Sequence, residues 1–130
     1  MKAYTNISQS KKLAEILPIK SADMWWNFYS VTTDNTTPQI IHLNTPWVGN
    51  FNWDNKSDNV PCWSLAALFS VLPSDIIRNE KTMFLTLEKA GAYNLYYKSP
   101  DRLDELWETD FEPIDACYKM IMELNELKLL

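Results

Sequence analysis

The chain has 130 residues, of which 46% are hydrophobic and 22% charged, and its formal net charge is −5. A length of about 100 to 150 residues is typical of a single hydrophobic core, so we predict one domain over residues 1–130. This composition excludes a disordered chain, and the apolar runs are too short for a membrane-spanning helix. Two cysteines exclude a disulfide framework. Because no signal-peptide pattern opens the sequence, we expect a cytoplasmic protein.

The first half of the chain predicts one helix and one hairpin. Leu13, Ile16 and Leu17 recur at helical spacing before Pro18, which predicts a short helix over 8–17. The aromatic-rich residues 24–31 and the β-branched residues 39–43 flank a polar stretch that favours a turn, so we predict a hairpin there. Residues 44–59 are rich in Asn, Asp and Pro and are expected to form a long loop.

A second helix is predicted over 61–72. Proline is favoured in the first turn of a helix, as Pro61 would be, and Pro73 would end the helix. Between Cys62 and Leu72 only two serines are polar. We therefore expect this helix to be buried nearly all round, at the centre of the core.

The last third of the chain predicts a hairpin and a long helix. Residues 82–89 and 92–98 have strand character and meet at Gly91, which suits a tight turn. Over 112–128 the apolar residues fall on one helical arc, Pro113 stands in the first turn and Asp115 favours the positive end of the helix dipole. We expect an α+β fold, with a small, mostly antiparallel sheet of two hairpins packed by the buried central helix and the amphipathic C-terminal helix.

Negative charge is concentrated in residues 101–115, which contain seven Asp and Glu residues and only one basic residue, Arg102. This segment would repel a nucleic-acid backbone and no basic stripe compensates for it, so direct nucleic-acid binding is not expected. Blocks of like charge are usually solvated, which favours a linker and helix entry. The alternative is an acidic surface, including Asp104, Glu105 and Glu108, that attracts a basic protein.

Cys62 is the main catalytic candidate. At the start of a helix its thiol pKa would be lowered, and with His42 it could form a nucleophile pair. The favoured interpretation is that Cys62 is a small apolar core residue, since no third catalytic partner is evident. Two separated cysteines and one histidine lack zinc spacing, and the isolated Gly49 and Gly91 form no phosphate-binding loop, so neither a metal nor a cofactor is expected.

The loop segment 47–55 is the main binding candidate, because Trp47, Phe51 and Trp53 are interleaved with Asn and Asp. Such residues can stack on an apolar ligand face and hydrogen-bond its polar edge, as in sugar sites and protein hot spots. The alternative is that Trp47 and Trp53 fold back and close the edge of the core.

Three stretches carry a resemblance to known proteins: residues 10–25, 60–73 and 115–130, which include Val-Pro-Cys-Trp-Ser-Leu-Ala-Ala-Leu-Phe. Together they resemble a family of small uncharacterised proteins carried by phages, prophages and other mobile elements of anaerobic gut bacteria. The resemblance implies an intracellular accessory protein of mobile DNA and supplies no activity, cofactor or catalytic residue.

These observations favour a non-enzymatic module that recognises a protein partner through an aromatic or acidic surface. Two other hypotheses stay open: a small Cys-dependent enzyme using Cys62, and a saccharide-binding module built on Trp47 and Trp53. The sequence predicts neither the partner nor the oligomeric state, and no contact with a membrane is expected.

Overall fold

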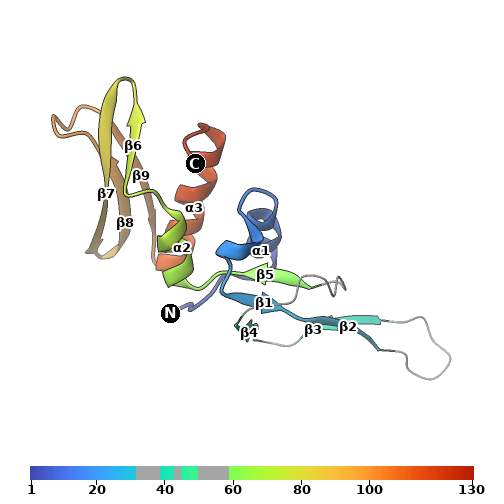
Figure 1. Ribbon diagram of the computed structural model, residues 1–130. Helices are drawn as coiled ribbons and strands as arrows, with labels where there is room; N and C mark the ends of the chain where they lie inside the picture. Colours follow the sequence, from blue (N-terminus) through green and yellow to red (C-terminus); the bar gives the residue numbers. More distant parts are fainter. Residues whose placement is uncertain (32–38, 43–44, 50–58) are drawn as a thin grey trace. The chain divides into compact units, whose positions relative to one another are not determined.

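A computed structural model of the chain describes residues 1–31, 39–42, 45–49 and 59–130. The structure divides into two compact units (Figure 1). One consists of Thr5–Ser64, and the other joins Met1–Tyr4 to Leu65–Leu130. The prediction of one domain over 1–130 stays a prediction, and each unit is described by itself below.

The Thr5–Ser64 unit contains two small antiparallel sheets. Strand β1 (Met24–Trp26) lies between β4 (Trp47–Val48) and β5 (Val60–Cys62). Strands β2 (Phe28–Val31) and β3 (Gln39–His42) pair with each other. The hairpin predicted for this region is therefore confirmed for 28–31 with 39–42, whereas residues 24–26 pair with other strands.

Helix α1 (Ile7–Ala14) confirms the predicted N-terminal helix, although the helix ends before Leu17. Asn6 caps it through a capping box with Gln9, which satisfies backbone N–H groups of the first turn. The buried Thr5 hydroxyl lies 2.7 Å from Ser10 Oγ of this helix and accepts a hydrogen bond from the Trp63 N–H just after β5. A single-turn 3₁₀ helix (Ile19–Ser21) follows α1.

The helix predicted over 61–72 is wrong at its start. Val60–Cys62 forms strand β5 because β1 offers its backbone as a pairing partner, and helix α2 begins only at Leu65 (Leu65–Val71). Ala67 and Leu68 are buried but Ala66 and Ser70 are exposed, so α2 is not buried all round. A run of apolar residues cannot by itself distinguish a buried strand from a helix.

The other unit contains a four-stranded antiparallel sheet in the order β6 (Asp75–Arg78), β7 (Lys81–Ala90), β8 (Ala92–Lys98) and β9 (Glu105–Asp110). The predicted hairpin is confirmed as β7–β8, and Gly91 has the positive φ, +75°, that its turn needs. The outer strands β6 and β9 were not predicted. The two predicted hairpins thus belong to separate sheets.

Helix α3 (Pro113–Glu126) confirms the predicted amphipathic C-terminal helix and packs on β8 and β9 beside α2 (Figure 1). Its apolar stripe, which includes Cys117, Met120, Ile121 and Leu124, is completely buried. The fold is α+β, as expected. No helix in the described part of the chain is long and apolar enough to span a bilayer.

Candidate functional site

The four-stranded sheet has one face covered by α3 and one open face. Leu95, Tyr97 and Leu106 are almost fully buried and therefore point toward the helix layer. Side chains alternate along a strand, so the neighbours Tyr96 and Trp107 point to the opposite face. All residues of this unit are described, and none of its helices lies on that face (Figure 1).

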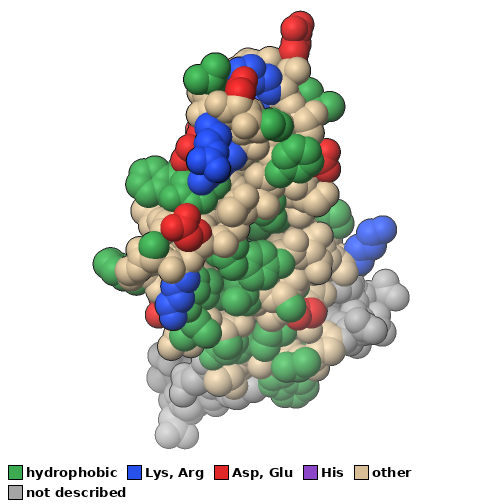
Figure 2. Space-filling view, turned by 90° about the vertical axis from the view of Figure 1, so that its left-hand side faces the viewer, with side chains coloured by type: hydrophobic (Ala, Val, Ile, Leu, Met, Phe, Trp, Pro, Cys, Tyr) green, Lys and Arg blue, Asp and Glu red, His purple; other side chains and the backbone are tan. Residues whose placement is uncertain are grey.

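The open face carries exposed hydrophobic side chains. Trp107 is 53% exposed, Phe84 51% and Ile77 69%. Tyr96 stands directly opposite Trp107, and their rings stack with centroids 6.1 Å apart and an interplanar angle of 10°. We call the three aromatic residues Phe84, Tyr96 and Trp107, together with the neighbouring Ile77, the aromatic patch. Figure 2 looks onto this side of the molecule and shows hydrophobic side chains interspersed with charged ones.

Two polar contacts fix the orientation of the aromatic patch. The indole N–H of Trp107 donates to Asn94 Oδ1 over 3.4 Å, and Lys98 Nζ lies 3.8 Å from the centroid of the Tyr96 ring. A cation over a ring is attracted by the electrons of the ring face. These contacts hold the two aromatic rings in place while the Trp107 side chain remains 53% exposed, which is the preorganisation a binding surface needs.

Carboxylates surround the aromatic patch. The strand register places Asp75, Glu88 and Glu105 on the open face, with Lys98 as the cation among them. The pKa of the Tyr96 hydroxyl is raised, first by partial desolvation and then by the negative charges of Glu88 and Glu105. By the strand register, carboxylates outnumber cations on this face.

The acidic residues that the sequence proposed for binding do not share one surface. Glu105 stands opposite Lys98 on the open face, whereas Glu108 faces α3. Asp104 belongs to the turn between β8 and β9, where its carboxylate pairs with Lys81 over 3.0 Å. Asp101 also pairs with Lys81 over 2.9 Å, so this part of the acidic segment stabilises a turn.

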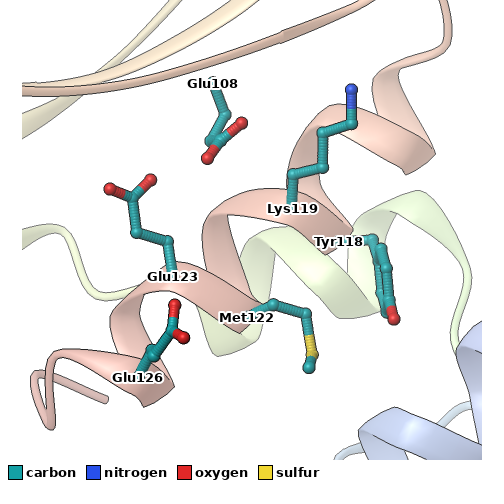
Figure 3. A pocket seen from close by; sticks show the side chains of 6 residues that line it. All are labelled: Glu108, Tyr118, Lys119, Met122, Glu123 and Glu126. Atoms are coloured by element: carbon teal, nitrogen blue, oxygen red, sulfur yellow. The ribbon is translucent and has the colours of Figure 1, made fainter.

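Glu108 lies at a pocket of about 510 Å³ beside helix α3. The pocket is lined by residues of β9 and α3, namely Glu108, Tyr118, Lys119, Met122, Glu123 and Glu126 (Figure 3). Burial raises the pKa of Glu108 from 4.5 to about 7, helped by the hydrogen bond and the negative charge of Glu123 and opposed by Lys119. Among the described residues, no cluster of three or more His, Cys, Asp and Glu side chains is suited to a metal ion.

The predicted aromatic loop is described only at its start. Trp47 is 48% exposed on β4, and its ring packs against Trp25 with centroids 4.8 Å apart. Phe51 and Trp53 lie outside the described residues. Binding through these three residues, to a protein or to a saccharide, therefore stays a prediction.

Cys62 has the properties of a core residue. Its side chain is completely buried in β5, and burial raises the pKa of its thiol. The lowered pKa expected at a helix start does not arise, because Cys62 lies in a strand and not at the N-terminus of α2. His42 lies in β3, and the structure describes its backbone only.

No protein-family model, curated protein or solved structure matches this chain. The function must therefore be argued from its own surfaces. The sequence analysis missed the aromatic patch, although alternation along 82–89 and 92–98 already separated Phe84 and Tyr96 from their buried neighbours.

Proposed function

We propose that this protein is a non-enzymatic protein-interaction module that binds a basic, partly apolar segment of its partner on the open face of the four-stranded sheet. The observation that carries the proposal is the exposed, preorganised aromatic patch around Tyr96 and Trp107. Tryptophan and tyrosine dominate protein hot spots because each removes a large apolar area from water and keeps a polar group for hydrogen bonding.

The charges on the open face support a basic partner. Asp75, Glu88 and Glu105 outnumber Lys98 there, and the ammonium of Lys98 already lies over the Tyr96 ring. A lysine or arginine of the partner would be attracted by these carboxylates and could stack on an exposed ring. An acidic segment or a nucleic-acid backbone would be repelled.

The resemblance to proteins of phages and mobile elements supports a biological context for this binding. It does not bear on which surface binds the partner. We place the module in the cytoplasm, as an accessory protein of such an element that acts on a protein partner. The test of binding does not depend on this setting.

The proposal is tested with the full chain and a synthetic peptide in which lysines alternate with apolar residues. We expect the peptide to shift the NMR amide signals of β7, β8 and β9, and Trp107→Ala to weaken binding about tenfold or more, as for a central hot-spot residue. Phe111→Ala is the matched control, since Phe111 is 81% exposed and follows β9 outside the sheet. This variant should bind as the unmodified protein does.

Two results would contradict the proposal. One is equal binding of a peptide whose lysines are replaced by glutamates, which would remove the charge argument. The other is unchanged affinity in Trp107→Ala while the variant keeps its melting temperature, which would show that the aromatic patch is not the binding surface.

A further inference from the structure

The contact between α3 and β9 contains a pair of carboxyl groups. Glu108 lies on the helix-facing side of β9, two residues after the buried Leu106. Glu123 projects from α3, and Figure 3 shows the two carboxyl groups directed toward each other. Both side chains line the same pocket, and Glu123 contributes to the raised pKa of Glu108 after burial. A hydrogen bond between two carboxyl groups needs a proton on one of them, because ionised carboxylates only accept.

The groups around this pair do not neutralise it. From α3, Lys119 and Glu126 line the same pocket, with the uncharged Met122 and the phenol Tyr118. The positive charge of Lys119 lowers the pKa of Glu108, but its Nζ lies 2.9 Å from Asp110 Oδ2 and donates to the Thr109 carbonyl over 3.1 Å. On β8 the residue opposite Glu108 is Leu95, which carries no charge.

We propose that Glu108 and Glu123 share one proton across the α3–β9 contact, and that loss of this proton to solvent weakens the attachment of the C-terminal half of α3 to the sheet. Two carboxylates at hydrogen-bond distance repel each other when both are ionised, so one of them retains its proton to higher pH. The inference goes beyond the proposed function because it concerns the free protein and needs no partner.

The sign of the effect on stability follows from the pKa of Glu108. In the unfolded chain the carboxyl group titrates near 4.5, and in the folded protein its pKa is raised to about 7. The folded state therefore binds more protons between these values. Its stabilisation by this proton is fully present below about pH 4.5 and is lost as the pH rises through about 7.

The test measures the unfolding equilibrium of the full chain in urea from about pH 5 to about pH 8. One proton gives at most a tenfold rise of the unfolding constant per pH unit, and solvent screening at this partly open site reduces the rise to about two- to fivefold. Glu123→Gln keeps a hydrogen-bonding side chain and removes the second charge, so its unfolding constant should vary less with pH, while the part of the pKa shift due to burial remains. Any contribution of His42 is common to both proteins and cancels in the comparison.

Glu126→Gln is the matched control, because Glu126 lines the same pocket but does not act on Glu108. It should retain the pH dependence of the unmodified protein. A Glu123→Gln variant whose unfolding constant varies with pH as steeply as that of the unmodified protein would overturn the proposal.

A second measurement decides the matter even if Glu123→Gln does not fold. The carboxyl carbon of Glu108 can be titrated by NMR in the unmodified protein. A midpoint near 7 supports the shared proton, and a midpoint near the ordinary 4.5 overturns it. Neither experiment involves a binding partner, so its failure is distinct from a failure of the proposed binding function.

Discussion

Replacing Ile121 by alanine tests whether α3 is anchored to the sheet as described. Ile121 lies on the buried stripe of α3 and is completely inaccessible to solvent. The substitution removes three carbon groups, each of which contributes about 0.8 kcal/mol when buried, so the transfer contribution alone is about 2.4 kcal/mol. The cavity left in a packed core adds to this, and we expect a loss of about 3 to 5 kcal/mol in the free energy of unfolding.

The assay is urea unfolding followed by tryptophan fluorescence and by circular dichroism, with thermal unfolding alongside. For a chain of this size about 1 kcal/mol corresponds to roughly 4 °C, so the melting temperature should fall by about 10 °C or more. Leu127→Ala is the control: it removes a side chain of the same size, but Leu127 is 40% exposed at the end of α3 and should cost less than about 1 kcal/mol. A loss below about 1 kcal/mol in Ile121→Ala would refute the described packing of α3.

Three further outcomes are expected. Burial raises the pKa of the Cys62 thiol and raises that of Cys117 to about 12, so iodoacetamide should label both slowly near neutral pH and rapidly in urea; rapid native labelling of Cys62 would revive the enzyme hypothesis. Hydrogen bonds from Ser99, Lys81 and the N–H of Leu103 lower the pKa of Asp101, so the ionised carboxylate stabilises the folded state above about pH 4 and this stabilisation is lost on acidification. Asp101→Asn should therefore make urea unfolding less sensitive to acid. Equal acid sensitivity in the variant and the unmodified protein would contradict this. Gly91→Ala should cost about 1 kcal/mol in thermal unfolding because φ is +75° there, and an unchanged melting temperature would show that the turn relaxes.

Local signals were sufficient for α3 and for the β7–β8 hairpin. In α3 the apolar period, Pro113 and Asp115 all agree, and in the hairpin Gly91 marks a turn between two runs of strand character. The same local reasoning was wrong for Pro61 and Cys62. Their strand exists because β1, far away in the sequence, pairs with it, and helix propensity is readily overridden by such tertiary contacts.

The acidic segment shows a different limit of sequence analysis. Glu105–Asp110 forms the strand β9, but its charges are typical of a solvated linker. Alternation separates Leu106 and Glu108 from Trp107 without indicating which set faces a helix. That assignment depends on where α3 packs, so the aromatic patch on the opposite face could not be identified until the helix was placed.

The first residues of the chain belong to the same unit as α3. The backbone N–H of Lys2 donates to a Glu112 carboxylate oxygen over 2.8 Å, and its Nζ lies 2.7 Å from Asp115 Oδ1, at the start of α3. During synthesis Lys2 leaves the ribosome long before Asp115, so these contacts form only after the whole Thr5–Ser64 unit has emerged. The unit formed by Met1–Tyr4 and Leu65–Leu130 can therefore complete its contacts only after the Thr5–Ser64 unit has been synthesised.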